Sequence, residues 1–346
     1  MIEIRNLTKR FGAFEAVKDL SFQVKPGEVL GFLGPNGAGK STTMKMVTGF
    51  LPPSEGTVIV CGHDVLESPR AAKAKIGYLP EGAPLYPDMT PRSMMKFVGA
   101  ARGMSRGRIA ERMQEVTRLV DLGAVLDQKI ETLSKGFKRR VGLALAILHD
   151  PDVLILDEPT DGLDPNQKHE VRQLIRSMAK GKVIVLSTHI LEEVEAVCTR
   201  AMIVSAGKKC FDGTPRDLRE HSRYAGSIEV SVATADAAAA EEAFTRLASV
   251  KSIGDHAEAG DETRFILFPV PGSRQSLLDD VQRISTEAPW TLLSLSVDRG
   301  RMDDVFRTVT SGEALTPIPS AAAAPELVTA ASGHDSSGDS SNGEAH

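Results

Sequence analysis

The chain has 346 residues and a formal net charge of −5, with 41% hydrophobic and 25% charged residues. This length leaves room for two domains and a tail, and the composition supports packed cores. The negative charge argues against general affinity for nucleic acids. Three scattered cysteines (Cys61, Cys198 and Cys210) lack the spacing of a disulfide framework or a metal site, which favours a reduced cytoplasmic protein. Apolar runs such as residues 141–148 fall far short of the ~20 residues of a spanning helix, so we expect any membrane role to be peripheral.

The N-terminal residues predict strands that lead into a buried core. Ile2 and Ile4 alternate with charged residues, and residues 20–24 alternate likewise, as half-buried strands do. Short apolar or β-branched runs bounded by turns predict further strands. These runs cover residues 29–33, 57–61, 76–80, 153–156 and 183–187, and a hairpin is expected over residues 202–205 and 209–212.

The segment from about residue 86 to residue 149 has a different character and is predicted to be a helical insert. Residues 91–102, 106–120 and 134–148 carry apolar side chains at helical spacing. In the second of these ranges the apolar positions recur every three or four residues, which predicts one buried face.

A glycine-rich stretch follows the strand at residues 29–33 and precedes a helix expected to begin at Thr42. It fits the phosphate-binding pattern G-x-x-x-x-G-K-[ST], in which backbone N–H groups and a helix N-terminus surround phosphate oxygens. Lys40 supplies a positive charge for the β- and γ-phosphates, and the Ser41 hydroxyl can bind Mg²⁺. The nucleotide-binding residues predicted here are Gly34, Pro35, Asn36, Gly37, Ala38, Gly39, Lys40, Ser41 and Thr42.

Three further positions have two interpretations each when they are taken alone. Asp157 and Glu158 end an apolar strand, where they can hold Mg²⁺ and polarise a water molecule, or can simply be solvated charges. His189 ends the next strand, and a lone histidine there is more often structural than catalytic. Phe11 can stack on an adenine ring, although its spacing favours an ordinary core position.

A second unit is expected from residue 223. Strands at residues 227–232, 250–256, 263–270 and 292–297 and helices at residues 234–247 and 273–285 follow the order β-α-β-β-α-β of a ferredoxin-like layer, with residues 302–310 as a terminal helix. Residues 313–346 are rich in Ala, Ser, Gly and Pro and contain no Lys or Arg, which predicts a disordered tail.

Taken together, five motifs over residues 1–220 resemble those of the ATP-binding cassette (ABC) ATPases. Residues 34–42 match the Walker A loop, and residues 153–158 match Walker B with its catalytic glutamate. Residues 162–165 resemble the D-loop, with Asp164 as its aspartate, and His189 matches the switch histidine. Residues 133–137, Leu-Ser-Lys-Gly-Phe, resemble the family signature Leu-Ser-Gly-Gly-Gln.

The resemblance implies an α/β fold: a P-loop NTPase core with an antiparallel β subdomain and a helical subdomain (about residues 86–149), together residues 1–222. Residues 223–312 would form a small C-terminal α+β domain. ATP and Mg²⁺ are the implied cofactors. Glu158, His189 and Lys40 become the expected catalytic residues, and Ser41, Asp157 and Glu81 the metal ligands. Phe11 becomes the expected adenine-stacking residue.

The resemblance also implies a dimer that sandwiches two ATP molecules. In the family, the signature helix, here with Ser134 and Gly136 at its start, points at the γ-phosphate bound by the other subunit. Two residues depart from the signature, Lys135 and Phe137, while the hydroxyl and the close-approach glycine remain. Glu81 stands where the family usually has glutamine. It either offers an oxygen to Mg²⁺ or is a loop carboxylate that faces solvent or a partner.

A single cassette followed by a small α+β domain resembles the ATPases of bacterial multidrug or gliding-motility-associated exporters. Residues 302–306, Met-Asp-Asp-Val-Phe, resemble the closing helix of their C-terminal domain. The resemblance implies integral-membrane permease partners, a homodimer or a pairing with a closely related ABC ATPase, and a location on the cytoplasmic face of the cell membrane. The alternative is a soluble ABC-type ATPase that acts on nucleic acid or ribosomes, but no nucleic-acid partner is expected at this charge. A cassette for cofactor assembly receives no support from the cysteines.

Overall fold

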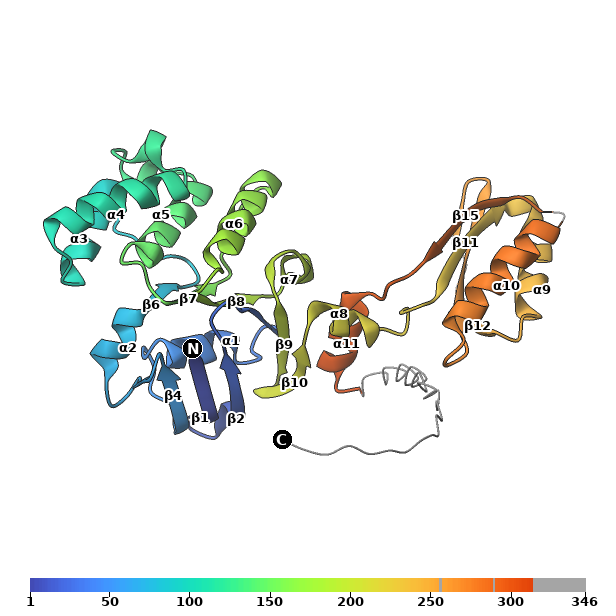
Figure 1. Ribbon diagram of the computed structural model, residues 1–346, viewed down its shortest axis with the longest axis horizontal. Helices are drawn as coiled ribbons and strands as arrows, with labels where there is room; N and C mark the ends of the chain where they lie inside the picture. Colours follow the sequence, from blue (N-terminus) through green and yellow to red (C-terminus); the bar gives the residue numbers. More distant parts are fainter. Residues whose placement is uncertain (255–256, 289, 314–346) are drawn as a thin grey trace, which may run out of the picture.

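The computed structural model describes residues 1–254, 257–288 and 290–313. Figure 1 shows a cassette connected to a separate α+β unit. The predicted tail lies almost entirely outside the described residues, which end at residue 313. Among the described residues, no helix combines the length and the apolar character required to cross a membrane.

An antiparallel sheet forms the N-terminal part of the cassette. Its strand order is β2-β1-β4-β5. The alternation of apolar and polar residues along β1 buries Ile2, Ile4 and Leu7 while their charged neighbours face outward. The strands are β1 (Ile2–Phe11), β2 (Phe14–Val24), β4 (Glu55–Val60) and β5 (His63–Asp64).

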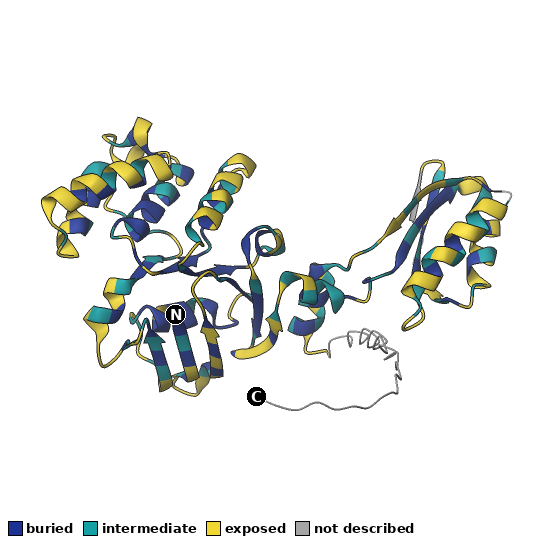
Figure 2. Ribbon diagram, in the orientation of Figure 1, coloured by how far each residue is buried: buried dark blue, intermediate teal, exposed yellow. Residues whose placement is uncertain are grey.

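A mixed sheet of six strands forms the centre of the cassette, in the order β10-β9-β3-β8-β7-β6. All neighbouring pairs are parallel except β10 with β9. β3, β7 and β8 are buried along their whole length, as expected for apolar strands that are covered on both faces (Figure 2). The strands are β3 (Val29–Leu33), β6 (Ile76–Leu79), β7 (Val153–Asp157), β8 (Val183–Thr188), β9 (Arg200–Ser205) and β10 (Lys208–Gly213).

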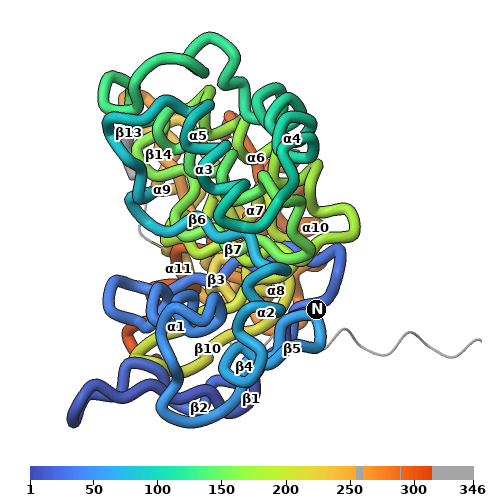
Figure 3. Tube along the Cα trace, turned by 90° about the vertical axis from the view of Figure 1, so that its left-hand side faces the viewer, coloured from blue at the N-terminus to red at the C-terminus, as the bar shows by residue number. Residues whose placement is uncertain are grey.

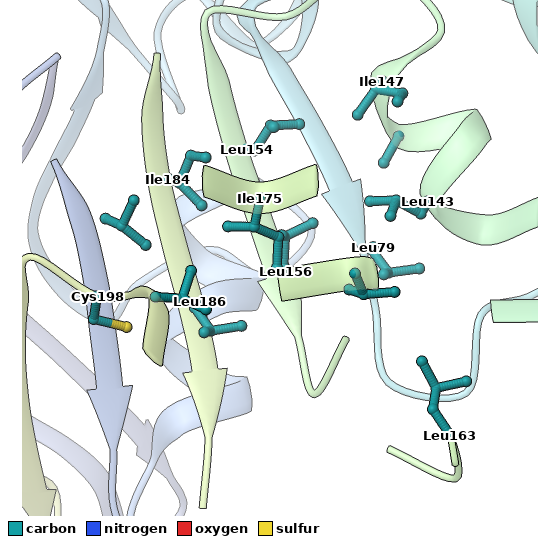
Figure 4. Close-up of a cluster of buried hydrophobic side chains, with 14 of the residues drawn as sticks. Leu79, Leu143, Ile147, Leu154, Leu156, Leu163, Ile175, Ile184, Leu186 and Cys198 are labelled. Carbon is teal, nitrogen blue, oxygen red and sulfur yellow. The ribbon is translucent and has the colours of Figure 1, made fainter. Parts of the chain in front are cut away.

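Two hydrophobic layers hold this sheet. On one face it packs against the antiparallel sheet and α1 through a cluster that includes Phe32, Met44 and Val58. On the other face Leu154, Leu156 and Leu186 meet side chains of the helices α5 (Lys135–Ile147) and α6 (Pro165–Met178), as Figure 4 shows. The helix α1 covers Lys40–Val47, and the other helices of this part are α2 (Pro69–Lys75), α7 (Leu191–Val197) and α8 (Pro215–Glu220).

The helical insert lies on the opposite side of the central sheet from the antiparallel sheet (Figure 3). Its helices begin at side-chain caps: Thr90 forms a capping box, and Ser105 and Ser134 each accept a bond from a backbone N–H three residues ahead. The elements are α3 (Pro91–Ala101), α4 (Arg106–Leu119), the 3-10 turns η1 (Gly123–Val125) and η2 (Ile130–Thr132), and α5 (Lys135–Ile147).

The α+β unit has its own core, built around Phe244, Phe265 and Trp290. Its antiparallel sheet runs β12-β14-β11-β15, which is the strand order of a ferredoxin-like layer, and β13 adds a short pairing with β14. The elements are β11 (Ile228–Ala233), η3 (Thr234–Asp236), α9 (Ala237–Thr245), β12 (Val250–Ile253), β13 (Ala257–Ala259), β14 (Glu262–Pro269), α10 (Arg274–Glu287) and β15 (Leu292–Val297).

The last helix, α11 (Met302–Ser311), does not pack where the sequence analysis put it. We assigned it to the α+β unit, but it returns to the cassette and packs against α8 and β9 (Figure 1). Met302, Val305 and Val309 share one helical face and are buried in the cassette core. The α+β unit is therefore inserted between two helices of the cassette.

Candidate nucleotide site

The glycine-rich loop connects β3 to α1, the context that its motif requires. Gly39 precedes α1 with φ of 100°, and a Cβ there would lie 2.5 Å from Ala16 O. A Cβ on Gly34 would lie 2.3 Å from Val204 O. Only glycine fits at these two positions, so the loop curls tightly and presents its backbone to the start of α1.

Lys40 is the first residue of α1, and its side chain is buried. Its ammonium group lies across the loop, where it donates to Gly34 O at 2.6 Å and to Pro35 O at 3.2 Å. Burial lowers the pKa of Lys40, while Glu158, Asp157 and Glu81 raise it. The lysine and the three predicted carboxylates therefore act on one another electrostatically.

Asp157 and Glu158 stand at the end of β7. The Asp157 side chain is buried, and its Oδ1 has no hydrogen-bond partner among the described residues. Glu158 adopts the left-handed conformation with φ of 50°, which is unusual for a residue with a Cβ. Its Oε1 lies 3.0 Å from Nδ1 of His189, and a carboxylate can only accept there, so His189 donates.

The donor set fits a magnesium ion. A buried carboxylate oxygen without a protein partner is costly unless a cation or water meets it, and Asp157 provides such an oxygen. Ser41 follows Lys40 at the start of α1 and is partly exposed. Carboxylate and hydroxyl oxygens are the hard ligands that Mg²⁺ prefers.

Glu81 lies in the exposed turn after β6. The negative charge of Glu81 raises the pKa of Lys40 and so opposes the lowering by burial. The pKa of Tyr78 is raised to about 12, mainly by burial and to a smaller extent by the charges of Asp157 and Glu81. These couplings link Glu81 to the carboxylate group at the end of β7. Both of our interpretations of Glu81 remain compatible with its exposure.

Ser134 is the N-cap of α5 and accepts from Phe137 N at 3.3 Å. Gly136 packs so closely on α6 that a Cβ would lie 2.3 Å from Gln167 Oε1. Asp164 caps α6 by accepting from Gln167 N at 2.9 Å. The signature and the D-loop are thus in contact within one chain, through the first turns of two helices.

Phe11 is 50% exposed at the end of β1, so the core interpretation of this ring is wrong. Lys9 Nζ lies 5.2 Å from the ring centroid. An exposed aromatic ring can stack on a base, whereas a core ring could not.

Arg139 is a residue of this region that the sequence analysis missed. It is buried in α5 and donates to the backbone carbonyls of Asp157, Glu158, Pro159 and Pro80. The available signal was a charged residue one turn after Gly136, on a helix whose later residues are apolar. Sequence alone could not distinguish it from its neighbours Lys138 and Arg140.

Comparisons with known proteins identify the family of this chain. The profile of the ABC transporter family matches residues 17–161. The Nod factor export ATP-binding protein I of Burkholderia lata is 41% identical over 230 residues, which are 66% of this chain and 76% of that protein. The linearmycin resistance ATP-binding protein of Bacillus subtilis is 38% identical over 219 residues, 63% of this chain and 70% of that protein.

Solved structures show the same cassette. An ATP-binding subunit of an ABC transporter has a TM-score of 0.59 and 32% identity, and the match covers 63% of this chain and 92% of that one. A dimeric bacterial ABC transporter cassette has a TM-score of 0.58 and 25% identity, with 62% and 99% covered. Family profile, relatives and fold agree, and the chain belongs to the ABC transporter family as one of its ATP-binding, ATP-hydrolysing proteins.

Proposed function

We propose that this chain is the ATPase subunit of an exporter. It would pair with a second copy, or with a closely related ABC ATPase, and would act at the cytoplasmic face of the membrane on a separately encoded permease. ATP would bind between the two cassettes and hydrolysis would release them.

The observation that carries this proposal is the separation of the two phosphate-facing elements within one chain. The phosphate loop belongs to α1, which packs against β2, β4 and β7. The signature belongs to α5, which packs against β6, α3 and α4 in the helical part. The N-terminus of α5, with the Ser134 hydroxyl, is suited to bind a phosphate. In a dimer, this N-terminus of one copy would face the phosphate that is bound by the loop of the other copy. A related bacterial cassette of known structure is dimeric, which supports this arrangement.

The residues of this chain would divide the work of hydrolysis. Lys40 and the loop backbone would bind the phosphates, and Phe11 would stack on the adenine. Ser41 and Asp157, with Glu81 as a further oxygen donor, would hold Mg²⁺, which neutralises charge on the triphosphate. Asp164 of the D-loop would contribute to nucleotide binding at the interface with the partner.

Glu158 would orient the attacking water and accept its proton. The water oxygen forms a bond to the γ-phosphorus, the bond to the bridging β–γ oxygen breaks, and ADP and phosphate result. His189, which donates to Glu158 Oε1 across 3.0 Å, would hold the carboxylate in place.

Export is proposed from the relatives, whose names describe Nod factor export and linearmycin resistance. The proposal assigns the membrane-spanning function to the permease. Recovery of a polytopic membrane protein with the full chain, purified from membranes in mild detergent, would support this part of the proposal. Recovery of ribosomes or nucleic acid instead would contradict it.

Glu158→Gln tests the mechanism. The amide has nearly the same shape, so ATP binding should persist, while loss of the general base should lower kcat by about 10²- to 10⁴-fold. The variant should accumulate as an ATP-bound dimer, which light scattering coupled to size-exclusion chromatography detects with and without Mg-ATP.

Two controls sharpen this test. Lys40→Ala should remain monomeric because it weakens phosphate binding. Ser134→Arg combined with Glu158→Gln should bind ATP yet fail to dimerise, because a bulky side chain blocks the signature face. A Glu158→Gln chain that binds ATP but stays monomeric would contradict the sandwich, and near-normal turnover would remove Glu158 from catalysis.

A further inference from the structure

Arg139 connects the signature helix to the end of β7. The side chain is 7% exposed and extends from α5, three residues after Gly136. Its guanidinium donates to Pro159 O at 3.2 Å and also to the carbonyls of Asp157 and Glu158. One buried cation therefore binds three successive carbonyls of the turn that carries the catalytic carboxylate.

The same guanidinium also reaches the Glu81 turn. Nη1 of Arg139 donates to Pro80 O at 3.0 Å, and Pro80 directly precedes Glu81. The planar fork of an arginine has five N–H donors in fixed directions, so it can hold several carbonyls in a defined arrangement. The two turns that present Glu158 and Glu81 are thus fixed relative to each other by one side chain.

The turn at Glu158 needs such support. Its φ of 50° is sparsely populated for a residue with a Cβ, and such a conformation persists only where its surroundings determine it. Peptide carbonyls that point at one cation cannot rotate freely. The direction of the Glu158 side chain depends on this backbone conformation, because the backbone sets the direction of the Cα–Cβ bond.

Four carboxylates on the surrounding elements affect the pKa of Arg139. Burial lowers the pKa of Arg139, while Asp161, Asp157, Glu158 and Glu81 raise it. A guanidinium remains charged in proteins, so the contacts stay charge-assisted. The contact is therefore strong as well as geometrically specific.

The other end of the connection is the signature. Gly136 and Arg139 belong to the same rigid helix, and Gly136 packs against Gln167 at the start of α6. A displacement of the start of α5 must therefore move Arg139 with it. A ligand that contacts Ser134 would act on the carbonyls at the end of β7 through a single helical turn and one side chain.

We propose that Arg139 is a positioning residue that transmits the state of the signature helix to the orientation of Glu158. The inference rests on the proposed function, in which Glu158 activates water and the signature receives the γ-phosphate of the partner. Arg139 would touch neither nucleotide nor water and would act through the backbone.

Arg139→Gln in the full chain tests this role. ATP affinity, measured by calorimetry, should change less than about 3-fold, while kcat should fall on the order of 10²-fold, as misplacement of a catalytic group does. Arg139→Lys keeps the charge with fewer donors and should recover part of the rate. A loss that appears in KM with kcat unchanged would overturn the proposal.

Arg112 provides a matched control. It is a second buried arginine of the helical part, 5% exposed, and donates to Leu148 O at 3.0 Å and to Ile147 O at 2.9 Å, at the opposite end of α5. Arg112→Gln should lower the melting temperature as much as Arg139→Gln does, yet leave kcat unchanged well below that temperature. Equal losses of kcat in both variants would overturn the proposal, because packing alone would then explain them.

A double-mutant cycle separates this proposal from the one on which it rests. In Glu158→Gln no carboxylate remains to be positioned, so adding Arg139→Gln should lower kcat by less than about 3-fold further. If Glu158→Gln itself turns over normally, the proposed role of Glu158 fails. If Glu158→Gln is slow and the two effects multiply in full, only the role of Arg139 is overturned.

Discussion

At the scale of single residues, Glu81 is a charge that departs from the family pattern. It acts on Lys40 together with Asp157 and Glu158. Glu81→Gln removes a negative charge near the triphosphate, so we expect tighter ATP binding and a higher kcat, both of the order of a few-fold, because the repulsion is partly screened. Steady-state rates and calorimetric affinities with Mg-ATP measure the two effects.

A control for this change is Glu67→Gln, an exposed carboxylate between β5 and α2. It alters net charge equally and should leave both constants unchanged. Complete loss of hydrolysis in Glu81→Gln would instead show that the carboxylate itself is required.

His149 predicts a pH dependence of stability. Burial and the nearby Arg102, whose Nη1 lies 2.9 Å from Nε2, lower the pKa of His149 from 6.5 to about 4. Below pH 6.5 the imidazole of His149 becomes protonated in the unfolded chain but stays neutral in the folded chain. The contribution of this residue to the free energy of unfolding is therefore lost as the pH falls toward 4. Because the ring is partly exposed and solvent screens its charge, the loss is on the order of 1 kcal/mol.

His149→Gln should therefore reduce the fall in unfolding free energy between about pH 7.5 and about pH 4.5, since glutamine can accept from Arg102 without titrating. Urea unfolding at the two pH values measures this difference. His169→Gln, an exposed position on α6, should leave the fall unchanged. A fall as steep in His149→Gln as in the parent chain would contradict the assignment.

At the scale of elements, α11 depends on its apolar face. Met302 is 5% exposed in the cassette core, so Met302→Ala should lower the unfolding free energy by about 2–5 kcal/mol. Arg307→Ala, on the outer face of the same helix, should change it by less than about 0.5 kcal/mol. Denaturant unfolding followed by circular dichroism distinguishes the two. Equal effects would mean that α11 does not pack as described.

The junction next to α11 explains why the helix returns. Asp304 accepts from the Ser222 hydroxyl at 2.8 Å and from Arg223 N at 3.0 Å, which ties α11 to the chain that leaves α8. Two cations lie near the ring of Tyr224, with Arg223 at 4.8 Å and Arg301 at 4.0 Å from its centroid. The α+β unit therefore begins and ends at one point of the cassette.

At the scale of the whole molecule, this arrangement predicts how the α+β unit can be removed. Gly226 N donates to Asp298 O at 2.8 Å and Asp298 N to Ser227 O at 2.9 Å, so the two chain ends are neighbours. Replacing residues 228–297 by a short Gly-Ser linker keeps α11 on the cassette. We expect this variant to bind ATP with affinity within about 3-fold of the full chain, because the nucleotide motifs all lie in residues 1–222.

Truncation after residue 222 is the informative comparison. It also keeps every nucleotide motif, but it exposes the face of α8 and β9 that Met302, Val305 and Val309 cover. It should bind ATP with a lower melting temperature than the linker variant. If the linker variant folds but shows no ATP binding by calorimetry, the α+β unit takes part in the nucleotide site.

Local patterns explain why much of the fold could be predicted. Apolar runs such as residues 153–156 are long enough to identify buried strands, and the loop at residues 34–42 is contiguous, so its chemistry is visible without a fold. The class of fold, the ferredoxin-like strand order and the ABC family are confirmed. The helices α2, α6, α7 and α8 were not predicted, because short or mostly polar segments gain their helical stability from the sheet they cover.

The sequence by itself determined the phosphate loop, the buried strands and the family, since each depends on residues close together in the chain or on a motif order. The tertiary structure alone decided that Phe11 is exposed, that α11 packs on the cassette, and that Arg139 binds the carbonyls at the end of β7. These features arise from contacts between segments that are distant in sequence. Which of several apolar or basic side chains makes such a contact depends on how the sheet brings those segments together.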